Sequence, residues 1–129
     1  MAKQNVFCID GNYFDIFIIS LKRNFVVQDS EKAGRAKSGL MHRDIIGTYY
    51  NYTMEIDAKR SNRDDYDAFY EIISSPQDSH HIVAPFGQDV LEFDAYISSG
   101  EDVLRVDAYG NHWMGISITC TAMEPQRRP

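Results

Sequence analysis

The segment from Ile45 to Asp57, with the sequence IIGTYYNYTMEID, has the most regular pattern in the chain. From Thr48 onward, alternate residues fall on two sides of an extended ribbon. One side carries Tyr50, Tyr52, Met54 and Ile56, while the other is mostly polar. A period of two is typical of a β-strand with one buried and one solvated face. The sequence therefore predicts a long strand here, with one face in the core.

The segment directly before this strand has the opposite character. Residues 29–40 (DSEKAGRAKSGL) contain no aromatic residue, two glycines and charges of both signs. A segment of this composition buries little apolar surface. We therefore expect residues 29–40 to protrude as a mobile arm that becomes ordered on assembly.

Shorter apolar runs on either side of these two segments predict further strands. Gly11-Asn12, between residues 6–10 and 13–18, indicates a hairpin, because both residues tolerate the positive φ of a tight turn. The chain then continues as a strand over residues 19–29. Later strands are predicted with turns around Gly87 and around Gly110-Asn111, at residues 81–86, 90–98, 103–108 and 113–122.

One helical pattern interrupts the strands at about residues 62–74. Ser61 or Asn62 can cap its start, and Pro76 stops it. Its large apolar residues recur at helical spacing and form one stripe, made of Tyr66, Phe69, Tyr70 and Ile73. We expect this stripe to lie on the sheet.

Together these elements predict a mainly β fold, an antiparallel β-sandwich or partly open barrel with one flanking α-helix. With 129 residues, 43% of them hydrophobic, the chain has the size of one domain. Residues 1–123 are assigned to this domain, and the polar, proline-containing residues 124–129 are expected to extend away from it. The predicted core includes Tyr50, Tyr52, Ile56, Phe69, Ile73, Ile116 and Ile118.

Charge and composition narrow the classes of function. The net charge of −6 argues against a surface that grips nucleic acid, which requires clustered Lys and Arg. The N-terminal residues lack the apolar stretch of a secretory signal, and no apolar run is long enough to span a membrane. We therefore expect synthesis in a cytoplasm and no membrane partner. Cys8 and Cys120 lie in apolar runs and are interpreted as buried thiols.

No group of residues has the pattern of a catalytic or metal site. His80 and His81 are neighbours in a predicted strand, so their side chains point to opposite faces. His42 and Asp44 lack a third ligand nearby. The carboxylates at the start and outer side of the helix are expected to cap and solubilise it, namely Asp64, Asp65, Asp67 and Glu71. We expect no enzymatic activity, no metal ion and no cofactor.

Four stretches of the chain resemble small structural proteins of the tail modules of tailed bacteriophages and prophages. They are NVFCIDG at residues 5–11, GLMHRDIIGTYYNYTMEID at 39–57, DDYDAFYEIISSP at 64–76 and WMGISITCTAMEPQR at 113–127. The resemblance covers nearly the whole chain and rests on pattern and order. It implies a tail-tube-like fold, a small β-sandwich or barrel with a flanking helix and a long hairpin or loop.

The same resemblance implies a structural role in the tail of a virion. Such proteins form rings, commonly hexameric, that stack into the tail tube, and genomic DNA passes through them without specific binding. Carboxylates facing the lumen would repel DNA phosphates and let the genome slide. A distal-tail, baseplate-hub or tail-terminator component is an alternative, because 129 residues is short for a major tube protein. The partners are then further copies of the chain and other tail proteins.

The arm is the predicted contact between subunits. Arg35 is the best candidate on the arm for this contact, since a planar guanidinium can bind a carboxylate of a neighbouring subunit through two hydrogen bonds. The predicted interface comprises Gly34, Arg35, Lys37, Gly39, Arg43 and Tyr49. A monomeric β-sandwich module that binds carbohydrate or peptide through Tyr49, Tyr109 and Trp113 stays open as a second class. A small hydrolase is a third and weaker class.

Overall fold

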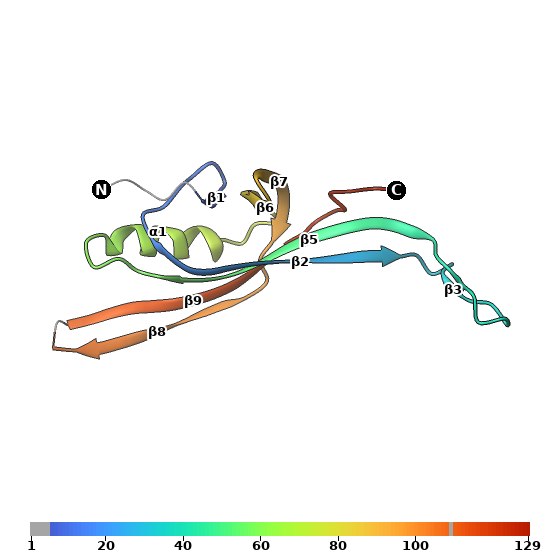
Figure 1. Cartoon of the computed structure of the whole chain (residues 1–129). Helices are drawn as coiled ribbons and strands as arrows, with labels where there is room; N and C mark the ends of the chain where they lie inside the picture. Colours follow the sequence, from blue (N-terminus) through green and yellow to red (C-terminus); the bar gives the residue numbers. More distant parts are fainter. Residues whose placement is uncertain (1–5, 109) are drawn as a thin grey trace.

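The computed structural model describes residues 6–108 and 110–129 (Figure 1). The fold is mainly antiparallel β with one flanking helix, as predicted, and no barrel closes within the described residues. The elements are β1 (Cys8–Ile9), β2 (Phe17–Asp29), β3 (Gly34–Arg35), β4 (Met41–His42), β5 (Ile45–Asp57), α1 (Arg63–Ile73), β6 (His80–Phe86), β7 (Asp89–Tyr96), β8 (Gly100–Asp107) and β9 (Gly110–Ala122).

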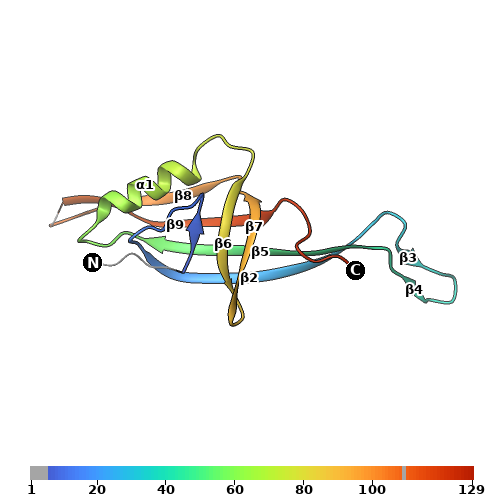
Figure 2. The ribbon, with the colours of Figure 1, turned by 90° about the horizontal axis from the view of Figure 1, so that it is seen from above.

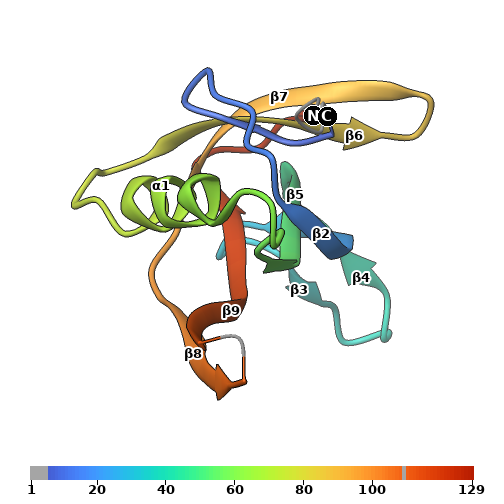
Figure 3. The same ribbon diagram turned by 90° about the vertical axis from the view of Figure 1, so that its left-hand side faces the viewer.

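Strand β9 joins two layers of strands. Its last residues pair with β7, residues 116–120 pair with β5 on one edge, and residues between Gly110 and Ile118 pair with β8 on the other edge. One layer is therefore β1-β6-β7, and the other is β8-β9-β5-β2. Figures 2 and 3 show β6 and β7 crossing over the long strands, with α1 beside them on the same side. This arrangement covers one face of the β8-β9-β5-β2 layer and leaves the other face to solvent.

Strand β5 has the bounds that its alternation predicts, Ile45–Asp57. Tyr52, Met54 and Ile56 are buried, whereas the intervening Thr53 is half-buried and Glu55 is exposed. The first part of β5 differs, because it runs beyond the covering layer and exposes Ile45 and Ile46. The strand therefore has a core half and an exposed half.

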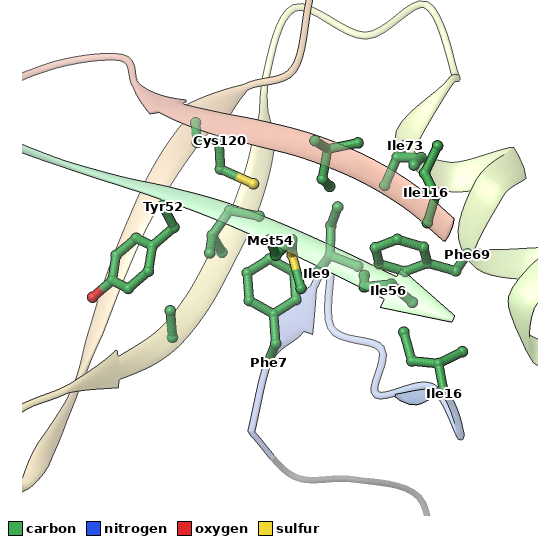
Figure 4. Packing of buried hydrophobic residues seen from close by; sticks show 14 of the residues in the cluster. Phe7, Ile9, Ile16, Tyr52, Met54, Ile56, Phe69, Ile73, Ile116 and Cys120 are labelled. Atoms are coloured by element: carbon green, nitrogen blue, oxygen red, sulfur yellow. The ribbon is translucent and has the colours of Figure 1, made fainter. Parts of the chain in front are cut away.

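Between the two layers lies a single apolar core (Figure 4). Six of the seven predicted core residues are buried in it: Tyr52, Ile56, Phe69, Ile73, Ile116 and Ile118. The prediction was wrong for Tyr50, which is only half-buried. Its ring meets that of Phe86 in the covering layer edge-on, at 4.9 Å between centroids. The predicted buried thiols, Cys8 and Cys120, are both in the interior.

Helix α1 begins and ends where the sequence predicts. The side chain of Asn62 caps it by accepting a hydrogen bond from the backbone N–H of Asp65 at 3.2 Å. Tyr66, Phe69 and Ile73 are buried against the sheet, which confirms the apolar stripe at these positions. Tyr70, the fourth residue of the stripe, is 37% exposed.

The predicted N-terminal hairpin was wrong. A tight turn does form, with Ile9 and Asn12 exchanging backbone hydrogen bonds of 3.0 and 2.9 Å. The strand before the turn pairs elsewhere, however, because Cys8 and Ile9 lie opposite Val83 and Ile82 of β6. The residues after the turn enter no strand until Phe17. The turn therefore leads the chain back to the core, and the segments on its two sides do not form a two-stranded hairpin.

The β8–β9 hairpin turns earlier than predicted. Asp107 lies opposite Gly110, so the two strands already pair at these residues and Asn111 belongs to β9. Tyr109 lies outside the described residues. Farther along, the register shifts between Glu101 and Val103, where Gly115 of β9 has φ +75°. This bulge changes which residues of β9 face α1.

The C-terminal tail lies on β5, which corrects the expectation that residues 124–129 extend away from the domain. The backbone N–H of Thr48 donates to the carbonyl of Arg127 at 2.8 Å, and Thr48 O accepts from Gln126 N at 3.1 Å. Gly47 permits this approach, since a Cβ there would lie 2.6 Å from Arg127 O and from Pro125 Cβ. One edge of β5 is therefore paired with β9 from Tyr52 onward and with the tail at Thr48.

Candidate assembly surface

The layer β8-β9-β5-β2 has two free edges. Within the described part of the chain, β2 pairs only with β5, and β8 pairs only with β9. An unpaired edge presents a row of backbone N–H and C=O groups to any strand that approaches. Thirteen residues of β2 and eight of β8 form these edges. Both are therefore long enough to accept another strand.

Both free edges also expose large apolar side chains. On β2, Phe25 is 68% exposed, and on β8, Val103 and Val106 are 65% and 70% exposed. Further apolar residues are exposed on the same two strands: Phe17, Ile19, Val26 and Leu104. Soluble monomers usually protect such edges with charges, bulges or covering segments. The exposure favours an edge that is covered by another chain.

The charges on the two edge strands are complementary. Strand β2 carries Lys22 and Arg23 against one carboxylate, Asp29. Strand β8 carries three carboxylates, Glu101, Asp102 and Asp107, against Arg105. Opposite charges on facing strands stabilise their pairing. A β2 edge therefore fits a β8 edge better than it fits another β2 edge.

The uncovered face of this layer is largely polar. Thr53 and Thr119 lie side by side with hydroxyl oxygens 3.3 Å apart, and the Asn51 amide donates to Asn24 at 3.2 Å. The charged residues near them, Glu55, Glu101 and Lys22, are of both signs. The acidic surplus predicted for a DNA-facing surface is thus not concentrated here. Small polar side chains dominate this face.

The predicted arm protrudes, but it is longer and more regular than expected. It leaves the β2–β5 ribbon where Ser30 N donates to Asp44 O at 2.8 Å, so it spans residues 30–44. Inside it, β3 and β4 pair in a small antiparallel ladder, Gly34 with His42 and Arg35 with Met41. Figure 1 shows the arm at one end of the molecule. The arm therefore has regular structure within a single chain.

Five of the six predicted interface residues lie on the arm: Gly34, Arg35, Lys37, Gly39 and Arg43. Arg43 is held at the base, where its guanidinium binds Asp29 through contacts of 3.0 to 3.2 Å. Arg35 donates one hydrogen bond to Gly39 O at 3.0 Å. The sixth, Tyr49, lies apart from the arm and packs half-buried against the core.

A groove lies at the other end of the molecule, between α1 and the β8–β9 hairpin. Its volume is about 330 Å³, and its lining is Tyr66, Asp67, Tyr70, Glu71, Asp102 and Trp113. Tyr66 is buried and donates to Asp102 at 2.9 Å. Burial and the neighbouring Asp102 raise the pKa of Tyr66, so its hydroxyl stays protonated. Trp113 is 49% exposed in this groove.

The sequence reasoning missed this groove. Trp113 was expected as one exposed aromatic residue among several, but nothing in the pattern placed it beside Tyr70 and Asp102. The bulge at Gly115 explains the difficulty, because it shifts the alternation of β9 by one residue before Trp113. Only the position of this bulge would have predicted which side of the hairpin faces α1.

The histidines behave as neighbours on opposite faces of a strand. His80 is buried, and its Nδ1 lies 2.7 Å from Asp10 Oδ2. Burial raises the pKa of Asp10, but the hydrogen bonds from His80 and from His81 N outweigh it and leave this pKa lowered. His81 is exposed, and the hydrogen bonds to Asp94 and Glu92 raise its pKa. The imidazole of His80 thus binds Asp10, while the imidazole of His81 binds Asp94 and Glu92.

A buried ion pair fixes the start of α1 to the N-terminal segment. Lys59 Nζ lies 2.6 Å from Asp15 Oδ1, and the Asn62 amide donates to Asp15 Oδ2 at 3.3 Å. The hydrogen bond from Lys59 is the main cause of a lowered pKa at Asp15, with a smaller contribution from Asn62. Asp15 N in turn donates to Asp65 Oδ2 at 2.7 Å. The cluster is structural, because it joins three segments of the fold.

Within residues 6–108 and 110–129, no three His, Cys, Asp or Glu side chains gather in a way that would hold a metal ion. No described helix is long and apolar enough to cross a membrane. Comparison with known protein families and with characterised proteins gives no match.

Proposed function

We propose that this protein is a structural component of a phage or prophage tail, which assembles into rings that stack into the tail tube or an adjoining ring. The observation that carries this proposal is the pair of free, apolar and oppositely charged edges on one layer, β2 and β8. A contact between two different surfaces closes into a ring when the rotation from one subunit to the next divides a full turn, and builds an open filament when it does not. The sequence resemblance to tail proteins supports the same architecture.

In such a ring, β2 of one subunit pairs with β8 of the next. The backbone groups of both edges then form hydrogen bonds, and their exposed apolar side chains leave water. The layers of all subunits join into one continuous sheet, whose uncovered polar face lines the lumen. Small polar side chains and mixed charges give a DNA phosphate no cluster of Lys or Arg to bind. The genome passes along such a surface without being held.

The experiment places a lysine on each edge in turn. Phe25→Lys and Val106→Lys put a charge where an approaching strand would pack, which opposes pairing of strands. Val90→Lys is the matched control, because Val90 is 61% exposed but lies on β7, outside both edges. We expect the two edge variants to sediment at the 14.8 kDa of one chain while the parent and the control assemble.

Melting temperatures near that of the parent would show that the edge variants remain folded. If they assemble like the parent, β2 and β8 are not the contact between subunits. If the parent itself is a monomer at every concentration, the protein forms no rings. The aromatic groove beside α1 would then favour the second candidate, a monomeric module that binds a ligand.

A further inference from the structure

The groove beside α1 combines aromatic walls with an acidic rim. Tyr70 and Trp113 are each partly exposed, and Asp67 and Glu71 project from the same side of the helix. Aromatic faces attract cations, and nearby carboxylates strengthen that attraction. The chemistry of the groove therefore suits a segment that carries both positive charge and an apolar side chain.

The tip of the arm is such a segment. Residues 32–40 carry Lys32, Arg35 and Lys37 and no carboxylate, within a chain whose net charge is −6. Two backbone hydrogen bonds of 2.8 Å, Ala36 N to Leu40 O and Gly39 N to Ala36 O, close the tip into a tight loop. Leu40 is 62% exposed beside these cations. The loop thus presents positive charge and one large apolar side chain in a fixed arrangement.

The arm and the groove lie at opposite ends of the molecule. In Figure 1 the arm extends beyond one end of the β2–β5 ribbon, while α1 and the β8–β9 hairpin lie toward the other end. An arm in this position is turned away from the groove of its own chain. Two copies in the same orientation, one behind the other, bring the arm of the first toward the groove of the second.

We infer that the groove formed by Tyr66, Asp67, Tyr70, Glu71, Asp102 and Trp113 is the receptor for the arm of a second copy of this chain. The inference rests on the proposed function, because it assigns the contact that stacks one ring on the next. Leu40 packs against Trp113 and Tyr70, and the arm cations bind Asp67 and Glu71. Arg35 suits this role because its guanidinium both stacks on aromatic rings and binds carboxylates.

Trp113 is the only tryptophan of the chain, so its fluorescence reports on the groove directly. The acceptor chain keeps Trp113 and carries Lys32→Glu, Arg35→Glu and Lys37→Glu, which disable its own arm. The donor chain carries Trp113→Phe, Asp67→Lys and Glu71→Lys, so it is free of tryptophan and its own groove is disabled. All these positions are exposed, so the substitutions do not disturb the core. The two chains bind each other in one direction only.

We expect the donor to shift the Trp113 emission of the acceptor to shorter wavelength, in a saturable way that high salt abolishes. The matched control is a donor that also carries the three arm substitutions, and it should produce no shift. An equal shift from that control, or no shift with the donor, would overturn the inference. Free polylysine that reproduces the shift as well as the donor would also overturn it, because the groove would then take any cation.

The same experiment separates this inference from the proposed function. Val106→Lys in both chains removes the β8 edge contact and leaves the arm and groove intact. If the pair that keeps Val106 forms no rings but the shift occurs with and without Val106→Lys, the stacking contact holds and the edge contact fails. If the pair that keeps Val106 forms rings and the shift is absent, the edges assemble the ring and the groove does not receive the arm.

Discussion

Gln126 occupies the place of a strand beside Tyr50. Its side-chain Oε1 accepts a hydrogen bond from Tyr50 N at 2.9 Å, and its Nε2 donates to Tyr50 O at 2.8 Å. One amide side chain thus satisfies both backbone groups that a neighbouring strand would have bound. The contact satisfies the edge of β5 beyond the end of its pairing with β9. The free edges of this layer are then β2 and β8.

Removing this contact should destabilise the fold. Gln126→Ala leaves the partly buried N–H and C=O of Tyr50 without these bonds, and an unsatisfied buried group costs about 1–3 kcal/mol. Arg128→Ala is the control, because the Arg128 side chain is 62% exposed and its ion pair with Glu124 is long, at 4.0 Å. Denaturant unfolding measures both. Equal stability of the two variants would mean that the tail contributes nothing to β5.

Phe69 anchors α1 to the sheet. Its side chain is fully buried, and its ring meets Phe14 edge-on at 5.6 Å between centroids. Phe69→Ala should therefore cost about 3–5 kcal/mol through lost burial and the cavity left behind. Glu71→Ala, on the exposed side of the same helix, should change the free energy of unfolding by less than about 0.5 kcal/mol. Similar losses for both variants would contradict the observed orientation of the helix.

Asp15 should make stability depend on pH in the acid range. Its pKa is lowered from 3.8 in the folded chain, mainly by the hydrogen bond from Lys59, so it stabilises the fold above that value. This contribution disappears as the pH falls through the lowered pKa. The melting temperature of Asp15→Asn should therefore lie below that of the parent at pH 7, and the gap should narrow below about pH 3.8. A gap that is constant with pH would show that the carboxylate charge does not matter.

The elements with a strong local pattern were predictable from sequence. The alternation of Ile45–Asp57 and the Asn62 cap determined the bounds of β5 and α1, because each depends on neighbouring residues alone. The predictions that were wrong concern contacts between segments that are distant in the sequence. Cys8 and Ile9 pair with β6, and the tail lies on β5 through backbone bonds to Thr48 and the Gln126 side chain. Neither contact leaves a periodic trace in the sequence.

The groove was beyond sequence reasoning for the same physical reason. It needs a bulge at Gly115, a half-exposed Trp113 and a carboxylate from β8 to meet one side of α1. The arm was predictable in place and composition, although its internal ladder was not. Its charge pattern was visible in the sequence, but the surface that complements it required the fold.

Shortening the arm tests whether it serves the fold or the assembly. The base of the arm keeps its own contacts, Asp29 with Arg43 and Ser30 with Asp44, when residues 32–38 are deleted. The change in loop length is worth well under about 1 kcal/mol, so the melting temperature should stay close to that of the parent. Electron microscopy should show rings that no longer stack. Stacks as long as those of the parent would mean that the arm is a solvent-exposed loop.

The mass and shape of the purified protein test the central claim most directly. Analytical ultracentrifugation with negative-stain electron microscopy of the parent chain should give a closed ring of several 14.8 kDa subunits around an open centre, with stacks at higher concentration. A compact particle of one subunit at every concentration, with no rings in the images, would contradict the proposal that this protein is a tail ring component.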